Sequence, residues 1–411
     1  MPVRLDLIVP PARRPESPNY WFLLGLLPVF LVVGIGLFVL FGPESLTKKP
    51  DAFWLVAVSM PVLLWLLLGA LVGLVFHSRH MVADVKDEVR AAVIARETRR
   101  GRRSLQVLAA SAHTALREPY AADGRAQMDA LQGSESALKA QRSWRSDADI
   151  VRHSRLPLLP DESTDAVLVR VFGQLLVELA GALAEIPKGT PLVVLFDAKG
   201  SELDEKSREL WQRAWSASGI DLPTRWAEKS GLEAVDHWLD RQIDDPALLL
   251  VIAAQVTPRL VEGSAEAVVG LLLGNHLTQK HLQPMACLHR PEQERKASTD
   301  ALTYAVRQAL DWVPLPTADV MQVWFSGIGR GRQAALATAL ARLEIAVKPG
   351  QGAHDLDASL GHAGSAAPWL AIAAAANAAH RNRTHQLIVC GERSEFPLPL
   401  WSVVVAPAAS L

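Results

Sequence analysis

The sequence predicts an α/β protein with two membrane-spanning helices near its N-terminal end. Two observations indicate this fold class: two uncharged apolar segments stand early in the 411-residue chain, and short apolar runs alternate with amphipathic segments over the rest. Half of the residues are hydrophobic and the net charge is −1. We expect a tail and transmembrane hairpin over 1–80, a charged juxtamembrane stalk over 81–103, and a cytoplasmic α/β domain over 104–411.

The two early apolar segments are long enough to cross a bilayer. They cover about 20–41 and 53–76 and contain no charged residue. A helix needs about 20 apolar residues to cross the hydrocarbon core. Neither segment resembles a cleaved signal peptide, because both are too long and the second follows the first at once. The sequence therefore predicts a multi-pass membrane protein, with the lipid bilayer as one of its partners.

Basic residues flank this pair of segments on both outer sides. The tail contains three arginines, and the segment after the second span contains many more basic side chains: Arg79, Lys86, Arg90, Arg96, Arg99, Arg100, Arg102 and Arg103. Because positively charged flanks stay on the cytoplasmic side, we expect both termini in the cytoplasm. The same basic stretch lies beside the membrane and the overall charge is near zero, so nucleic-acid binding is not expected.

Helical and strand-like segments alternate from residue 104 onward. We expect strands at 105–112, 191–198, 246–255, 266–277, 320–326, 386–390 and 401–406. We expect helices at 166–186, 207–219, 231–243, 300–312, 331–343 and 366–380. Nearly continuous apolar strands between amphipathic helices are typical of sheets covered on both faces.

Several kinds of chemistry lack the residues that they need. The two cysteines, Cys287 and Cys390, provide no disulfide framework, which agrees with a reducing compartment. No metal-ligand spacing and no phosphate-binding loop occurs, and the glycines of 327–331 lack the dinucleotide frame. We therefore expect no metal and no cofactor.

Five segments together resemble one known superfamily. They are LQVLAASAHTALREPYAADGRAQMDALQGSESALKAQRSW, KSGLEAVDHWLDRQIDDPALLLVIAAQ, EGSAEAVVGLLLG, LGHAGSAAPWLAIAAAANAAH and VVVAPA. In this order they resemble the opening strand, nucleophile helix, following strands and Gly-His segment of the thiolase-like superfamily, and of the β-ketoacyl synthases in particular. The resemblance covers most of 104–407. It implies an α-β-α-β-α layered domain built from two similar halves.

The resemblance also implies where a catalyst would lie, and most of that catalyst is missing. A synthase holds a thiolate at the start of the nucleophile helix, but the chain there reads Lys229-Ser230-Gly231, without cysteine. The turn that should supply a first histidine, 325–330, has none, and only His362 matches. The vestigial candidates are His362, Ser230 and Cys287. Their simpler interpretations are a structural turn residue, a helix N-cap and a strand cysteine.

Two functions follow, and the sequence favours the first. The first is a membrane-anchored, non-catalytic pseudo-ketosynthase that acts as a binding or adaptor protein and is able to form a homodimer. As a whole the chain also resembles adaptor proteins of bacterial type VI secretion systems, which implies an inner-membrane location and a secreted effector or secretion component as partner. The alternative is a membrane-tethered acyl-transfer or condensing enzyme that uses Ser230 or Cys287 with His362.

Overall fold

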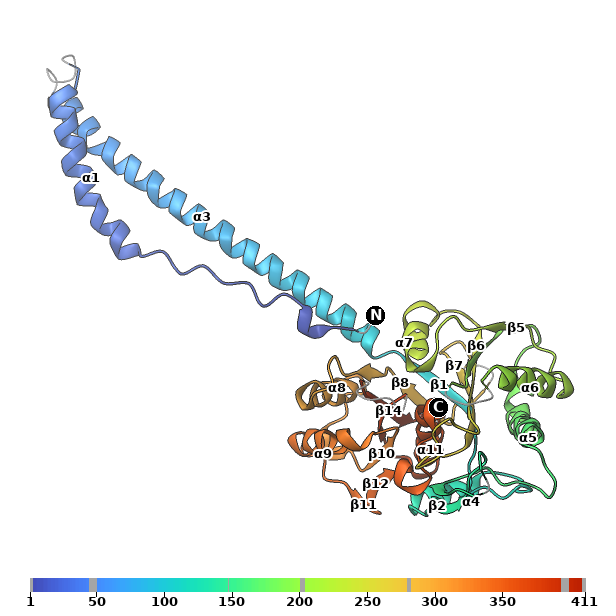
Figure 1. Ribbon diagram of the computed structural model, residues 1–411. Helices are drawn as coiled ribbons and strands as arrows, with labels where there is room; N and C mark the ends of the chain where they lie inside the picture. The colour runs from blue at the N-terminus through green and yellow to red at the C-terminus, as the bar shows by residue number, and fades with distance from the viewer. Residues whose placement is uncertain are drawn as a thin grey trace. The chain divides into compact units, whose positions relative to one another are not determined.

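The chain divides into two compact units. The computed structural model describes residues 3–43, 50–146, 148–199, 204–278, 282–392 and 399–408. Residues 4–98 form an N-terminal helical unit, and residues 99–411, together with the first three residues, form a folded α/β unit. Figure 1 labels their elements along the chain.

Two long helices build the N-terminal unit. They are α1 (Tyr20–Phe41) and α3 (Pro50–Gly101), the latter with 52 residues, and a short 3₁₀ helix (Leu5–Leu7) precedes them. The apolar windows of α1 and α3 have mean hydropathies of 2.8 and 2.5, so both helices are long and apolar enough to cross a membrane. The expected second span and stalk are one unbroken helix.

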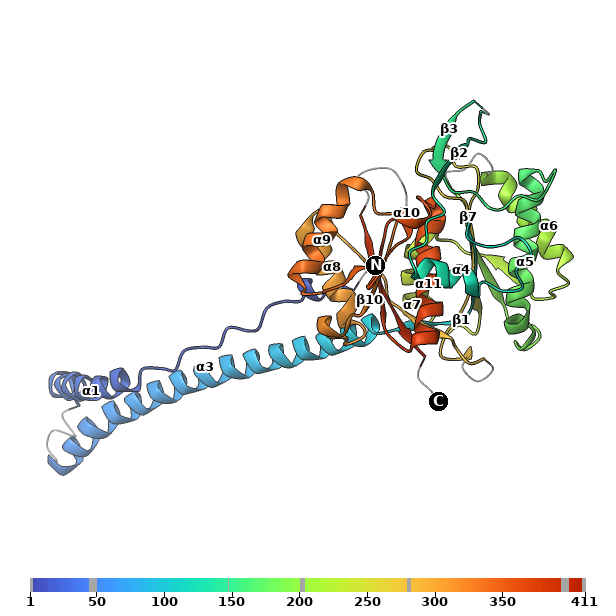
Figure 2. The same ribbon diagram turned by 90° about the horizontal axis from the view of Figure 1, so that it is seen from below.

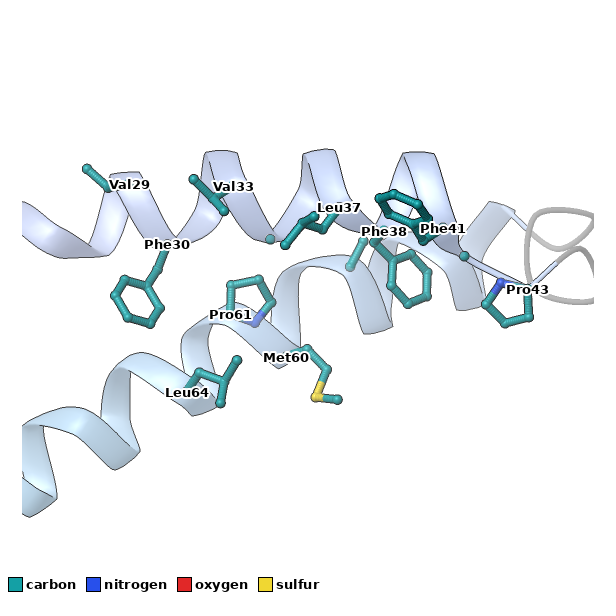
Figure 3. Close-up of a pocket in the computed structure, with 13 residues that line it drawn as sticks. Val29, Phe30, Val33, Leu37, Phe38, Phe41, Pro43, Met60, Pro61 and Leu64 are labelled. Atoms are coloured by element: carbon teal, nitrogen blue, oxygen red, sulfur yellow. The ribbon is translucent and has the colours of Figure 1, made fainter.

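The two helices pack closely at one glycine. A Cβ atom on Gly34 would collide with the ring of Pro61, so only glycine allows this approach. The indole N–H of Trp65 donates to the carbonyl oxygen of Leu23 at 2.7 Å. Beside the crossing lies an apolar pocket of about 510 Å³, whose walls include Phe30 and Phe38 of α1 (Figure 3).

The N-terminal tail lies along the part of α3 that follows the apolar window. The backbone N–H of Ala12 donates to Asp87 at 2.9 Å, and Arg90 donates to the carbonyl oxygen of Val9 at 2.8 Å. Arg14 and Asp84 form an ion pair at 3.7 Å. The segment before the first apolar helix and the segment after the second apolar window therefore lie at the same end of the hairpin.

The folded unit repeats one βαβαβαββ arrangement twice. The first half contains β1 (Ser104–His113), α5 (Thr164–Ala184), β4 (Leu192–Asp197), α6 (Asp204–Ala217), β5 (Thr224–Trp226), α7 (Gly231–Arg241), β6 (Leu248–Gln255) and β7 (Ala267–Gly274). The second contains β8 (Ala286–His289), α8 (Thr299–Asp311), β10 (Gln322–Ser326), α9 (Gln333–Arg342), β12 (Gly352–Asp355), α11 (Ala367–Asn382), β13 (Gln386–Cys390) and β14 (Trp401–Pro407).

Both halves order their strands in the same way. Across the sheet the order is β5-β4-β6-β7-β1 in the first half and β12-β10-β13-β14-β8 in the second. The first strands of the two halves, β1 and β8, pair antiparallel and join the halves. In each half the last strand along the chain, β7 or β14, runs antiparallel to its two neighbours. The matched topology shows a pseudo-twofold repeat, in agreement with the two similar halves that the resemblance implied.

Helices and sheets alternate in layers (Figure 2). One apolar core joins α5 and α6 to the outer face of the first half, and a second joins α8 and α9 to the outer face of the second half. The largest core contains α7, α11 and the inner faces of both halves. Along β4, Val193 and Leu195 belong to the inner core, whereas Leu192 and Val194 belong to the outer one, so both faces are buried.

Helix α11 contacts strands of both halves from its place between them. It is rich in alanine, and small side chains allow two sheets to approach one helix from opposite sides. The third apolar helix, α5, is also long enough to span a membrane. Its buried face instead packs on β1 and β7 inside the folded unit.

The sequence pattern did not predict several short elements. They are α4 (Arg125–Gln132), the hairpin of β2 (Lys139–Arg142) and β3 (Ile150–His153), β9 (Glu292–Gln293), β11 (Lys348–Pro349) and α10 (Leu356–Ser359), with 3₁₀ turns at Thr317–Asp319, Arg330–Arg332 and Gly364–Ala366. Each is too short to show a periodic apolar pattern.

Candidate functional site

Helix α7 begins at the junction between the two halves. Its first residue, Gly231, has a φ of 61°, which a residue with a side chain rarely adopts. A Cβ atom there would collide with the carboxylate of Glu392, which follows β13 of the second half. That carboxylate accepts a hydrogen bond from the backbone N–H of Leu232 at 2.5 Å. The first backbone N–H groups of a helix have no partner within the helix and favour an anion. Here the carboxylate of Glu392 is that anion.

Ser230 is the N-cap of α7, although its hydroxyl makes no capping hydrogen bond. The hydroxyl oxygen instead accepts from the ammonium group of Lys199 at 2.9 Å. Lys199 follows β4 and is exposed. Lys199 is 31 residues away from Ser230 in the chain, so only the fold brings the two side chains together.

Lys199 also connects this helix start with the turn that contains His362. Its backbone N–H donates to the hydroxyl of Ser365 at 3.1 Å. Ser365 donates in turn to the carbonyl oxygen of Asp197 at 3.4 Å, and the indole of Trp369 donates to the Asp197 carboxylate at 3.3 Å. The end of β4 thus holds the starts of both inner helices, α7 and α11.

Hydrogen bonds hold His362 in place through its backbone and one ring nitrogen. Its backbone N–H donates to Gly263 at 2.8 Å, and its carbonyl oxygen accepts from Ala265 at 2.9 Å and from Gln255 at 2.8 Å. The ring Nδ1 accepts from the N–H of Gly364 at 2.9 Å. This is the bonding pattern of a structural turn residue.

The ring of His362 is poorly suited to act as a base. Burial lowers the pKa of His362, which favours the neutral imidazole. Because Nδ1 accepts a hydrogen bond, the neutral ring carries its proton on Nε2. That Nε2 finds no hydrogen-bond partner within the described part of the chain. In this tautomer Nε2 carries the proton and Nδ1 is engaged by Gly364, so neither nitrogen is free to accept a proton from a nucleophile.

A second carboxylate holds the turn in which the resemblance places the first histidine. Both oxygens of Asp357 accept backbone hydrogen bonds, from Gly327 and from Ile328, each at 2.9 Å. Gly327 has a φ of 70°, and a Cβ atom there would collide with the carbonyl oxygen of Gly391. Burial is the main cause that raises the pKa of Asp357 to about 7. This turn therefore lies directly beside the residue that precedes Glu392.

The structure places the two cysteines differently. Cys390 ends β13, two residues before Glu392, and burial together with the charges of Glu392 and Asp357 raises its pKa well above the ordinary value. Cys287 lies in β8, paired with Gln106 of β1 and with Ala406 of β14. Burial raises the pKa of Cys287 as well. A nucleophilic cysteine needs a lowered pKa at a helix start, and neither thiol meets that condition.

Three of the residues that line this site had no signal in the sequence. Glu392 and Lys199 each follow a strand, Asp357 lies in the short helix α10, and no motif marks them. Over the residues that the structure covers, no group of three histidine, cysteine, aspartate or glutamate side chains could hold a metal ion. The contacts described here involve Ser230, Lys199, His362 and the carboxylates of Glu392 and Asp357.

Comparisons with known proteins agree with this arrangement of strands and helices. No protein-family model matches the chain, and no curated protein matches it. Among solved structures, the ishigamide ketosynthase/chain length factor is 15% identical, with a TM-score of 0.51 over 74% of this chain and 100% of that chain. The folded unit has a thiolase-like fold. The PfaC keto synthase-chain length factor is also 15% identical, with a TM-score of 0.50 over 75% of this chain and 43% of that one.

At this identity the likeness establishes the thiolase-like fold and not an activity. The expected mixed α/β architecture of the folded unit is confirmed at that level. The residues at the start of α7 must therefore be interpreted from their own contacts.

Proposed function

We propose that this chain is a membrane-anchored, non-catalytic thiolase-like protein that binds a protein partner. The observation that carries the proposal is the contact of Glu392 with the start of α7. A synthase of this fold needs a thiolate at that place, and Gly231 leaves no side chain there. The carboxylate of Glu392 occupies the adjacent space, and its negative charge would oppose the ionisation of any nearby nucleophile.

The neighbouring groups support the same conclusion. His362 carries its ring proton on the nitrogen that a base would use, as its hydrogen bond with Gly364 indicates. The turn at Gly327 is closed by Asp357 and contains no histidine. A thiolase-like scaffold without these catalytic groups keeps a rigid layered core and large outer helices, which is sufficient for a binding function.

The anchoring part of the proposal rests on α1 and α3. Both helices are long and apolar enough to span, and the contacts of the tail with Asp84, Asp87 and Arg90 keep both flanks at one end of the hairpin. With the basic flanks, this favours the inner membrane of a bacterium with both termini in the cytoplasm. The adaptor resemblance then favours a secreted effector, or a component of a type VI secretion system, as the partner.

Recovery of partners tests the binding function. Full-length protein is cross-linked in its own membranes and purified, and its partners are identified by mass spectrometry. We expect a secreted toxin or a secretion component, and equal recovery with the Ser230→Ala variant. Recovery of acyl carrier protein or of lipid-synthesis enzymes would contradict the adaptor function.

One observation favours the alternative, an acyl-transfer enzyme with Ser230 as nucleophile. Lys199 donates to Ser230 at 2.9 Å at a helix start, which is the geometry of a serine–lysine pair. A lysine acts as a base only in its neutral form, which burial favours, and Lys199 is exposed. Intact-mass analysis after incubation with acyl thioesters decides between the enzyme and the binding protein. An acyl adduct that disappears in Ser230→Ala would replace the binding proposal with the enzyme.

A further inference from the structure

One face of α3 beyond the apolar window is apolar and uncovered. Val82, Val85 and Val89 are 54%, 57% and 57% exposed, and Ala92 is exposed as well. These four residues, the valine seam, follow one another at spacings of three, four and three. This is the a/d spacing of a heptad, in which every seam residue faces the same side of the helix.

The opposite face of the same helix is already covered by the N-terminal tail. Asp87 and Arg90 hold the tail through backbone groups of Ala12 and Val9. Ala83, on that covered face, is only 4% exposed. The tail therefore leaves the valine seam as the uncovered side, away from its own contacts.

A bilayer does not cover the seam either. Charged residues surround it on the helix, among them Asp84, Lys86, Asp87, Glu88 and Arg90. Helix α3 continues through this region without a break, so it leaves the membrane along the axis of its span and cannot bend to lie flat on the surface. At 1.5 Å per residue, positions 77–98 extend about 33 Å beyond the apolar window.

A second copy of this chain fits the seam best. If the anchoring proposed above holds, on which this step rests, all copies insert with the same orientation, so their α3 helices are parallel. Parallel coiled coils accept β-branched residues such as valine at their a positions, which Val82 and Val89 occupy, and the d positions hold Val85 and Ala92 in place of leucine. Lys86 and Glu88 flank the seam on opposite sides, so one edge carries a positive charge and the other a negative charge.

We propose that the valine seam is the contact of a parallel homodimer. The seam is short, about one and a half heptads, and a coiled coil of that length is marginal in dilute solution. Confinement of both copies to one membrane favours their association, because it raises the effective concentration of the second helix. Exposed Leu71 and Val75 continue the same side of the helix into the apolar window.

Site-directed cross-linking in native membranes tests the seam. Full-length Val85→Cys and Val89→Cys are oxidised and compared with Ala91→Cys, an exposed position only two residues away that faces away from the seam. We expect a disulfide-linked dimer for the two seam variants and its loss for Ala91→Cys. The unsubstituted chain is the control for disulfides formed by the native cysteines, of which Cys390 is buried and Cys287 is half-buried.

Two further results separate this proposal from the anchoring on which it rests. A protein extracted from membranes by alkaline carbonate would overturn the anchoring, and the parallel dimer with it. A protein that stays in the membrane but forms equal dimer at 89 and 91, or none, would overturn the seam alone. A Val85→Glu/Val89→Glu variant should lose the dimer band in native electrophoresis, whereas Ala91→Glu should keep it.

Discussion

Glu392 accepts a hydrogen bond from the backbone N–H of Leu232 at 2.5 Å, and this contact joins the second half of the fold to the first. The two residues are 160 positions apart in the chain. The contact lies at the helix start where the resemblance to the synthases places a nucleophile. It also makes the start of α7 a structural junction, which leads to the first prediction.

Removal of the Glu392 carboxylate should destabilise the folded unit. An anion at a helix start contributes about 0.3–1 kcal/mol, and a hydrogen bond to a charged group about 1.5–3 kcal/mol. We expect Glu392→Gln to lose about 1 kcal/mol and Glu392→Ala about 1–3 kcal/mol in denaturant unfolding of the full-length protein. Equal stability of Glu392→Ala and the unsubstituted protein would show that the contact is not formed in solution.

Two glycine substitutions should have opposite effects. Gly231→Ala introduces a Cβ atom at a φ of 61° and against Glu392, and strain of this kind costs about 1–3 kcal/mol. Gly181→Ala, at an exposed position in the last turn of α5, meets no atom within 4 Å and should add about 0.5–1 kcal/mol. Thermal unfolding measures both.

A double substitution separates the two causes at Gly231. In Gly231→Ala/Glu392→Ala the collision is gone and only the backbone strain remains. The pair should therefore lose less stability than the sum of the two single variants. Strict additivity would show that Glu392 does not crowd this position.

Asp357 should make stability depend on pH in the direction opposite to an ordinary salt-bridged carboxylate. Its pKa is raised to about 7 in the folded protein, mainly by burial, from an ordinary value of 3.8. Between these values the folded state binds more protons than the unfolded state, so this group favours folding at low pH, and that contribution is lost as pH rises through about 7.

The Asp357→Asn variant isolates this effect. As pH rises from about 4 to about 7, the unsubstituted protein should lose stability relative to the variant by at most about 1.4 kcal/mol per pH unit. Glu292, whose pKa is also raised to about 7, is present in both proteins and cancels in the comparison. A constant difference between the two unfolding curves across this range would contradict the assignment.

Substitution of His362 should change stability without changing function. His362→Ala removes the acceptor for the N–H of Gly364 and should cost about 1 kcal/mol. His362→Asn places an oxygen near the same position and should recover most of that loss. Partner recovery should be unchanged in both variants. A variant that keeps its unfolding temperature but loses partner or acyl adduct would give His362 a direct functional role.

Local pattern was enough to predict several parts of this protein. The uncharged segments at 20–41 and 53–76 lie in helices α1 and α3, because a long apolar run needs no distant partner to be recognised. Alternation of apolar and amphipathic segments predicted the mixed α/β unit. The ranges expected for α5, α7 and α11 differ from the observed bounds by only a few residues.

The candidate site was only partly visible in the sequence. Ser230 was placed correctly at the start of a helix, but its expected capping hydrogen bond is absent, because its hydroxyl accepts from Lys199. Cys287 was offered as a nucleophile, yet it lies inside the sheet between β1 and β14, where nothing lowers its pKa. Glu392 and Asp357 carried no motif.

The sequence by itself determined which segments are apolar, which are helical, and that no cysteine stands at the start of α7. These properties depend on neighbouring residues and on composition. Only the tertiary structure decided what fills that place, since Glu392 and Lys199 reach the start of α7 from the ends of two different strands. Asp357 reaches the turn at Gly327 from helix α10. Contacts between groups so far apart in the chain arise from the matched packing of two halves around α11, and no local pattern records them.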